Sequence, residues 1–484
     1  MKSLEPVSSA LWFCCLLVLA LSLRVVALGK RSFWLDEATS CLLAQCDWHT
    51  FVTALYKYQA NMALYYFLLR WWAHFGNSEA WLRLLSVLFG VAAIPLLYKL
   101  GQVVFDTRTA RIAALLMTVH VLHIQFSQEA RGYSLEVFLA ILSGYLFVSM
   151  LVSSSRRIVV AYILASALLV YAHLFGVLLL AAEWSCAVVL SHSTHTNKRV
   201  GIAAMLICIL VAPLIFSLLV VSDRTQLSWI SRVNSSSLYQ FANLFSGNGG
   251  MVLLILYISL LCSSLWSHLR RSKESGRVEV NYSFVWMWLV LPVFVVGAIS
   301  RYHPILQSRY LLFCLPPFLL IASDGLVQIK SRLIFFAALV SISCLSAFGL
   351  TAYFAYRVDQ DHSDDWRDAT SYCLSHMRSG DAVLFTYSSE EMPFRAYERR
   401  IAAHPGSVPL LPQQTDLELL STKAKWANAA DAHDAMAHAT RIWVVTALQP
   451  NEHSNETKEV LKTKFHQQLT QKFGFVVVQL FVPA

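Results

Sequence analysis

Two adjacent carboxylates, Asp36 and Glu37, form the most informative feature of the sequence. They lie in the hexapeptide Phe-Trp-Leu-Asp-Glu-Ala at residues 33–38, just beyond the first apolar stretch that is long enough to cross a membrane. Charge at the edge of a bilayer is tolerated where water or a bound polar substrate meets it. An ionised carboxylate in such a place can take a proton from a hydroxyl group as a bond forms. The pair therefore marks a candidate site for chemistry at a membrane surface.

The composition indicates that this site is carried by a polytopic α-helical membrane protein. Of the 484 residues, 57% are hydrophobic and 14% are charged, whereas a soluble protein is usually about 45 to 50% apolar. Runs of roughly 17 to 25 apolar residues could each cross about 30 Å of hydrocarbon as a helix. We predict about eleven transmembrane helices, centred near Leu19, Ala92, Met117, Leu142, Ile163, Ala182, Ile209, Ile255, Val290, Leu319 and Leu339.

The distribution of basic residues predicts the orientation of these helices. The net charge of +9 does not indicate nucleic acid binding, because the basic residues sit mostly in short connections between apolar runs. Such residues favour the cytoplasmic side of a membrane. The basic connections contain Arg108, Arg111, Arg156, Arg157, Lys198, Arg199, Arg270, Arg271, Lys273, Arg277, Lys330 and Arg332. The alternate connections, including the one with Asp36, are then non-cytoplasmic.

The C-terminal part of the chain differs from the rest and predicts a small α/β domain. We place a transmembrane domain at residues 1–355, with a first outer loop at about 29–80, and an extracytoplasmic domain at residues 356–484. Short apolar runs bounded by turn residues predict buried strands, and amphipathic spacing predicts helices. The predicted strands are 381–386, 441–446 and 475–480, and the predicted helices are 364–378 and 454–472.

Several short motifs, in order along most of the chain, resemble the polytopic glycosyltransferases of the GT-C class. The similarity is to the family that includes protein O-mannosyltransferases and the bacterial aminoarabinose transferases of lipid A. The motifs are Asp36-Glu37, Leu64-Tyr65-Tyr66, the stretch from Gly76 to Leu84, the stretch from Phe126 to Ser134, Arg309-Tyr310-Leu311-Leu312 with Pro316, and Asp365-Trp366-Arg367-Asp368. The resemblance implies transfer of a sugar from a polyprenyl-phosphate donor to an extracytoplasmic acceptor, which is a lipid, a glycan or a protein, with inversion at the anomeric carbon.

The resemblance also implies roles for particular residues. Asp36 would be the catalytic base that accepts the acceptor proton. Arg131 and Arg309, followed by His173 and Arg83, would stabilise the negative charge that grows on the lipid phosphate. The remaining predicted substrate-binding residues are Glu37, Asn61, Tyr65, Tyr66 and Tyr133.

Each of these roles has a structural alternative that the sequence leaves open. Asp36 could cap the helix that follows it, because aspartate is a favoured N-cap residue. Glu37 could orient a basic partner or be an ordinary loop carboxylate. The arginines could anchor helices at the membrane interface, and His173 could be a buried core residue. The three tyrosines could belong to the aromatic belt of a membrane protein.

The chain departs from the family pattern just before the tyrosine pair. Ala60 and Asn61 stand where lipid A-type members have a glutamate and a basic residue, which weakens the case for an aminoarabinose donor and for a metal held there. Histidine and cysteine spacing supplies no metal-ligand pattern, so no cofactor is predicted. The expected location is a bacterial inner (plasma) membrane, with the active site on the periplasmic side. A transporter or lipid flippase that breaks no bond is the alternative, although such a protein tends to place polar groups near the midplane. A non-catalytic assembly partner in an envelope polysaccharide system is a third.

Overall fold

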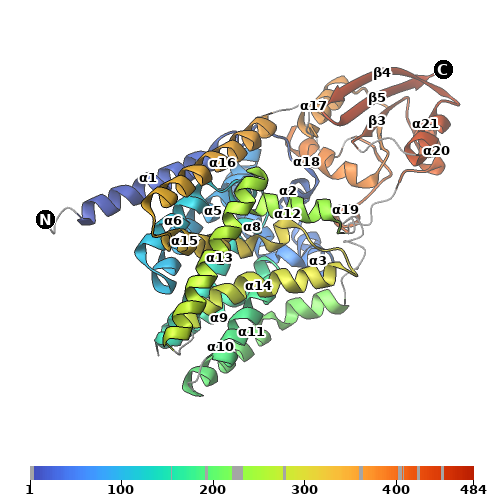
Figure 1. Ribbon diagram of the computed structural model, residues 1–484. Coiled ribbons are helices and arrows are strands. Elements are labelled where there is room, and N and C mark those ends of the chain that lie inside the picture. The colour runs from blue at the N-terminus through green and yellow to red at the C-terminus, as the bar shows by residue number, and fades with distance from the viewer. Residues whose placement is uncertain are drawn as a thin grey trace.

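The computed structural model describes residues 5–153, 155–190, 194–220, 233–275, 280–358, 364–401, 406, 408–421, 426–447 and 452–484. A bundle of long helices forms most of the molecule, and a mixed sheet with helices on both faces lies at one end of it (Figure 1). The predicted fold class, a polytopic helical protein with a small C-terminal α/β domain, is confirmed.

The bundle is built from helices that precede residue 359. They are α1 (Glu5–Val25), α2 (Leu35–Gln45), α3 (Trp48–Lys57), α4 (Ala63–Trp72), α5 (Glu79–Val104), α6 (Thr107–Val119), α7 (Val121–Ser127), α8 (Tyr133–Val152), α9 (Arg156–Ala172), α10 (Gly176–Leu190), α11 (Thr194–Val220), α12 (Ser235–Phe245), α13 (Gly250–Ser275), α14 (Val280–Ser300), α15 (Leu315–Val327) and α16 (Arg332–Val358). Short 3₁₀ helices are η1 (Ala60–Met62), η2 (Ala73–Phe75) and η4 (Ser308–Cys314).

Each of the eleven predicted helix centres lies within one of these helices. Among the described residues, seven helices are long and apolar enough to cross a membrane, and an eighth span results if α6 and α7, which are bent by 58°, count as one. Residues Ala10–Val25 of α1 and the whole of α10 are apolar but shorter. The number of eleven spans therefore stays a prediction.

Arg24, near the end of α1, stabilises the bend between α6 and α7. A helix that breaks leaves its last carbonyl groups without amide partners. The buried Arg24 guanidinium donates to two of them, the carbonyls of Met117 and Thr118, at 3.2 and 3.1 Å. It also contacts Ser127 and His123 of α7 at 3.3 and 2.6 Å. Arg24 thereby fixes α7, whose end leads directly into the segment 128–132.

The two ends of the helix bundle, which α5 joins, have different surroundings. At one end, Glu79 at the start of α5 bonds Tyr397 of the C-terminal domain. At the other end, Val104 of α5 lines a cavity together with Arg271, which belongs to the predicted basic cluster at residues 270–277. The structure thus places this basic cluster and the contact between Glu79 and Tyr397 at opposite ends of α5, while the orientation in the membrane stays a prediction.

The C-terminal domain is a three-layer α/β unit, seen at the upper right of Figure 1. Its elements are α17 (Trp366–His376), β1 (Asp381–Phe385), η5 (Ser388–Glu390), α18 (Glu391–Ile401), β2 (Leu410–Leu411), α19 (Asp416–Leu420), α20 (Ala429–His438), β3 (Arg441–Thr446), α21 (Glu452–Leu461), β4 (Phe465–Phe473) and β5 (Val476–Pro483). The sheet order is β2-β1-β3-β5-β4. The first three strands are parallel, with Val383 opposite Trp443, and the last two pair antiparallel.

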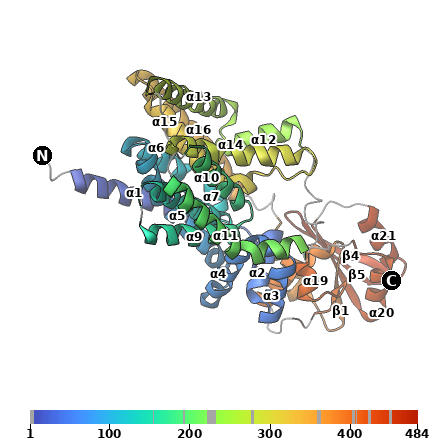
Figure 2. The ribbon, with the colours of Figure 1, turned by 90° about the horizontal axis from the view of Figure 1, so that it is seen from below.

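Alternate residues of the central strands pack on opposite faces, as the two-residue period of a strand requires. Val383 and Trp443 belong to the core that is continuous with the bundle, whereas Leu384 and Val444 pack into a second core with α20 and α21. On the first face, α18 packs against α2. In both views α2 and α19 lie between the bundle and the sheet (Figure 2).

The predicted strands and first helix of this domain agree with β1, β3, β5 and α17. The predicted helix 454–472 is wrong in its second half, because α21 ends at Leu461 and β4 follows from Phe465. Phe465, Leu469 and Phe473 recur every four residues, which is typical of a helix. Pairing along nearly the whole length of the apolar strand β5 overrides this local pattern.

Candidate active site

Helix α2 begins with the two carboxylates that the sequence singles out. Its N-cap is Trp34, which makes no side-chain cap hydrogen bond, and Asp36 and Glu37 lie in the first turn. The interpretation of Asp36 as a helix cap is therefore wrong. Carboxylates are favoured in a first turn by the helix dipole. Because neighbouring residues point about 100° apart around a helix, the two carboxylates have different surroundings.

Asp36 belongs to what we call the open cluster, made of Asp36, Tyr66, Arg131 and Arg309. Its Oδ2 accepts a hydrogen bond from Nη1 of Arg309 at 3.1 Å and lies 3.9 Å from Nη2 of Arg131. The Asp36 side chain is 29% exposed, and the two arginines are 15% and 12% exposed. The open cluster is thus a solvent-reachable carboxylate beside two partly buried cations.

Glu37 belongs to what we call the locked cluster, made of Glu37, Arg83 and the backbone N–H of Ala130. Both carboxylate oxygens of Glu37 accept from Arg83, at 2.8 and 2.6 Å, and Oε1 also accepts from Ala130 at 2.8 Å. The side chains of Glu37 and Arg83 are 1% and 2% exposed. Of the two open interpretations of Glu37, the structure favours the one in which it orients a basic partner.

Arg83 uses all of its donors within the protein. Besides Glu37, it donates to the carbonyls of Leu28, Arg31 and Ser32 at 2.7, 2.9 and 3.1 Å. A guanidinium has five N–H groups, so this arrangement reserves none for a substrate. Arg83 therefore suits a positioning role, in which it holds the segment before α2, better than the predicted contact with substrate.

The three predicted tyrosines are buried inside the bundle, so they do not form an aromatic belt at the lipid surface. Tyr66 accepts a hydrogen bond from Arg131 at 2.6 Å. Tyr65 bonds Ser86 at 2.8 Å, and Ser86 in turn donates to the carbonyl of Arg131 at 3.1 Å. The tyrosine pair on α4 therefore fixes both the backbone and the side chain of Arg131.

His173 and Asn61 lie together, deeper than the open cluster. Asn61 accepts from the N–H of Leu174 at 3.1 Å, and its amide nitrogen lies 3.4 Å from Nε2 of His173. The fully buried His173 contacts Glu136 at 3.2 Å, and its ring lies 5.8 Å from the Tyr133 ring. The structure thus brings His173, Asn61 and Tyr133 together. Among the described residues, His173 makes no hydrogen bond or ion pair with Asp36.

Glu129 is a candidate site residue that the sequence reasoning did not select. Among the described residues, the only hydrogen bond to its side chain is a long one, 3.5 Å, from Gln125, and its Oε2 is buried without a partner. Burial and the neighbouring Glu37 raise the pKa of Glu129 to about 7, against the lowering effects of Arg357 and Arg309. The sequence could have indicated Glu129 as a site residue, because it lies two residues before Arg131 in the motif from Phe126 to Ser134.

Two residues on α16 complete the support of this segment. Arg357 donates to the carbonyl of Gln128 at 3.2 Å, and the Tyr353 hydroxyl donates to the Gln128 side chain at 2.7 Å. The Gln128 amide donates to the carbonyls of Arg24 and Val26 at 3.0 and 2.8 Å. No sequence motif marked these long-range contacts.

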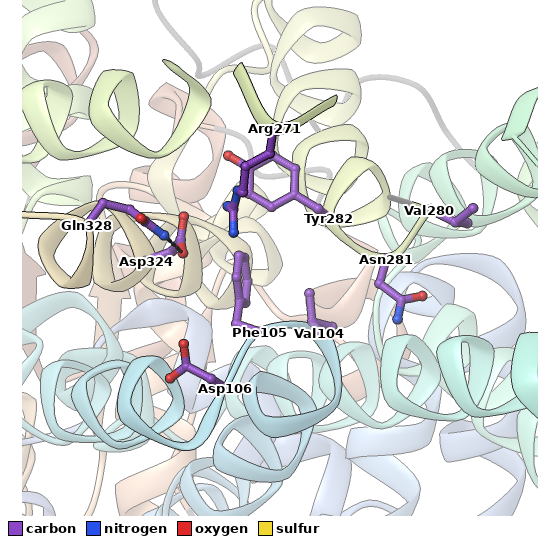
Figure 3. Close-up of a pocket in the computed structure, with 9 residues that line it drawn as sticks. All are labelled: Val104, Phe105, Asp106, Arg271, Val280, Asn281, Tyr282, Asp324 and Gln328. Carbon is purple, nitrogen blue, oxygen red and sulfur yellow. Dashed lines mark hydrogen bonds between the residues drawn. The ribbon is translucent and has the colours of Figure 1, made fainter. Parts of the chain in front are cut away.

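A separate cavity of about 490 Å³ lies at the opposite end of the bundle. Figure 3 shows its lining, which includes Asp106, Arg271, Tyr282, Asp324 and Gln328. The carboxylate of Asp324 is engaged within the protein, because it accepts from Ser264 at 2.6 Å and from Gln328 at 3.0 Å. None of the predicted site residues lines this cavity. Within the described ranges, no group of three or more His, Cys, Asp or Glu side chains could hold a metal ion.

Comparison with solved structures shows that the fold is similar to those of ArnT and of an archaeal oligosaccharyltransferase. The similarity extends over the whole chain to ArnT from Cupriavidus metallidurans in the apo state, with a TM-score of 0.68, 12% identity and 98% of each chain covered. ArnT bound to undecaprenyl phosphate gives a TM-score of 0.67 at 11% identity, covering 97% of this chain and 98% of that one.

A more distant similarity extends beyond bacteria. The oligosaccharyltransferase AglB from Archaeoglobus fulgidus, in complex with an inhibitory peptide and a dolichol-phosphate, gives a TM-score of 0.54 at 11% identity, covering 94% of this chain and 72% of that one. No protein-family model and no curated protein matches the sequence. At these identities the comparisons show the fold, and the activity must be argued from the site.

Proposed function

We propose that the protein is a membrane glycosyltransferase that moves a sugar from a polyprenyl-phosphate donor to a hydroxyl-bearing acceptor outside the cytoplasm. The open cluster is the observation that carries this proposal, because it places one solvent-reachable carboxylate beside two guanidinium groups. The fold agrees with it, since similar structures contain undecaprenyl phosphate or a dolichol-phosphate.

Asp36 acts as the general base in this reaction. The acceptor oxygen attacks the anomeric carbon and gives its proton to the carboxylate, while the bond from that carbon to the phosphate oxygen breaks. The bonding electrons leave with the polyprenyl phosphate. A single displacement of this kind inverts the anomeric configuration. Oδ2 of Asp36 faces the arginines, which leaves Oδ1 as the oxygen for the acceptor.

Arg131 and Arg309 bind the donor phosphate and stabilise its growing charge. Guanidinium groups form strong charge-assisted hydrogen bonds to phosphate oxygens, and donors fixed in advance favour the transition state. Tyr66 holds Arg131 through its hydroxyl at 2.6 Å. The open cluster contains two guanidinium groups and one carboxylate, so positive charge is in excess within it where the phosphate would arrive.

The site faces the periplasm of a bacterial inner membrane in this proposal. The basic connections lie at the other end of the bundle, where Arg271 lines the cavity of Figure 3. Excess basic residues mark the cytoplasmic end. The C-terminal domain then lies outside the cytoplasm, next to the acceptor.

The transporter alternative has less support from the structure. It would need accessible polar groups near the middle of the spans. The carboxylate of Glu183, in the middle of α10, is buried and accepts hydrogen bonds from Tyr162 at 2.7 Å and from Ser143 at 3.0 Å. This network satisfies the carboxylate within the bundle and suits a structural role.

The proposal is tested by following both products of bond cleavage. Purified protein in liposomes is incubated with polyprenyl-phosphate donors, each carrying a radiolabelled sugar, and with cell-envelope extract as the source of acceptor. We expect equal amounts of released polyprenyl phosphate and transferred label, with the anomeric configuration inverted by NMR. Movement of intact donor across the bilayer without release of lipid phosphate would contradict the proposal and favour transport.

A further inference from the structure

The segment that leads into α2 is held from two sides. On the bundle side, Arg83 binds its carbonyl groups, as described above. On the other side, Arg367 of the C-terminal domain donates to the carbonyls of Gly29 and Lys30 at 3.3 and 3.1 Å. The Ser32 hydroxyl donates to the carbonyl of Asp364 at 2.5 Å. The chain just before the catalytic carboxylate therefore lies between two structural units that are far apart in sequence.

Tyr397 on α18 contacts the chain three residues before Asp36. Its hydroxyl accepts a hydrogen bond from the N–H of Phe33 at 2.8 Å and donates to Oε1 of Glu79 at 2.9 Å. The Tyr397 and Phe33 rings stack with their centroids 5.7 Å apart. Both residues are buried. One hydroxyl therefore ties the residue before the N-cap of α2 to the first turn of α5.

Glu79 joins this contact to the rest of the C-terminal domain. Its Oε2 accepts from Arg400 at 2.8 Å, and its Oε1 lies 3.1 Å from Nε of Arg367. The Arg400 guanidinium also lies over the Phe33 ring, 5.3 Å from its centroid. Three side chains of the soluble domain thus converge on one carboxylate of the membrane domain, directly beside the start of α2.

We infer that Tyr397 is a positioning residue through which the C-terminal domain sets the place of Asp36. The significance for catalysis rests on the proposed function, in which Asp36 is the base. Displacement of a catalytic group by about 1 Å can slow a reaction on the order of 100-fold. The C-terminal domain is then part of the catalytic machinery, in addition to any role in choosing the acceptor.

The substitution Tyr397→Phe tests this inference, because it keeps the ring and removes the hydroxyl. The buried N–H of Phe33 then lacks its partner, and the segment gains freedom to move. In the full-length protein we expect faster hydrogen exchange in residues 29–38, by about 10-fold, measured by mass spectrometry. We also expect kcat for sugar transfer to fall roughly 10-fold, with KM for the donor within about twofold of wild type.

Tyr372→Phe is the matched control. Tyr372 lies on α17 in the same domain, and among the described residues it forms side-chain hydrogen bonds at its carbonyl and not at its hydroxyl. We expect neither measurement to change. If Tyr397→Phe cannot be purified in folded form, Arg400→Gln removes a neighbouring contact to Glu79 and should raise the exchange in the same segment by a smaller factor.

Two results would overturn the inference. One is wild-type exchange protection of residues 29–38 in Tyr397→Phe, whatever its activity. The other is an unchanged kcat despite faster exchange. Faster exchange in a protein whose wild type transfers no sugar would support the contact itself and contradict the proposed function, so the two failures are distinguishable.

Discussion

The open and locked clusters begin with adjacent carboxylates and differ in almost every physical respect. The Asp36 side chain is 29% exposed and lies 3.1 Å from Arg309 and 3.9 Å from Arg131. The Glu37 side chain is 1% exposed and accepts two hydrogen bonds from Arg83, at 2.6 and 2.8 Å. Arg83 has all of its donors engaged by the protein.

This difference shows that the two carboxylates of the Asp36-Glu37 motif can have different roles. A buried and fully paired carboxylate gives rigidity, since any movement would leave a charge without its partner. A partly exposed carboxylate with longer contacts can exchange partners during a reaction. The locked cluster therefore holds the start of α2, while the open cluster has the freedom that the proposed binding of substrate requires.

The largest expected effect on stability comes from breaking the locked cluster. Glu37→Gln leaves the buried charge of Arg83 without its counter-ion, which typically costs about 3 to 5 kcal/mol. We expect a correspondingly lower free energy of unfolding in detergent, measured by denaturant titration.

The control for this variant is Glu274→Gln, which removes an exposed ion pair with Arg270 on α13. It should change stability very little, because exposed pairs contribute little. Equal stability of Glu37→Gln and the wild type would mean that the locked cluster does not hold the fold.

A smaller effect is expected from removing one cation of the open cluster. Arg309→Gln should weaken binding of undecaprenyl phosphate roughly 10- to 100-fold, because a charged hydrogen bond contributes about 1.5 to 3 kcal/mol. Isothermal titration in detergent measures this affinity. Arg301→Gln, an exposed arginine close in sequence, should bind like the wild type. If both variants bound equally well, the donor phosphate would have to lie elsewhere.

A further expected effect concerns pH and Glu129, which interacts electrostatically with Glu37 of the locked cluster and with Arg309 of the open cluster. Burial, with Glu37, raises the pKa of Glu129 from its usual 4.5 to about 7, so the folded state holds this proton more tightly than the unfolded state. Stability should therefore fall as pH rises from about 4.5 to 7. Glu129→Gln should remove that fall, which is roughly 3 kcal/mol because each pKa unit corresponds to about 1.4 kcal/mol. Identical pH profiles of stability for variant and wild type would contradict this assignment.

The sequence predicted the components of the site better than their arrangement. Membrane-length apolar runs and the strands at 381–386 and 441–446 follow from local pattern, and the same pattern led to the proposal that Asp36 is the base. The pairing of Arg309 with Asp36 joins distant parts of the chain and depends on how the helices pack. The same limit explains β4, where pairing with β5 overrides helical spacing.

The local sequence pattern also could not predict the separate roles of Asp36 and Glu37. Asp36 and Glu37 are chemically alike, and only the placement of α2 in the folded chain decides which one meets Arg83 of α5. The sequence contained no indication of a role for Tyr397 either, because Tyr397 and Phe33 are 364 residues apart in the chain. Such contacts are properties of the folded core.

The most direct test of the account is the activity of Asp36→Asn, compared with Asp47→Asn. Asp47 is the N-cap of α3 in the same outer loop, and asparagine caps a helix equally well. We predict that Asp36→Asn lowers kcat for sugar transfer by at least about 100-fold, while its unfolding midpoint stays near that of the wild type and Asp47→Asn remains fully active. Transfer by Asp36→Asn within a few-fold of the wild type would contradict the assignment of Asp36 as the base.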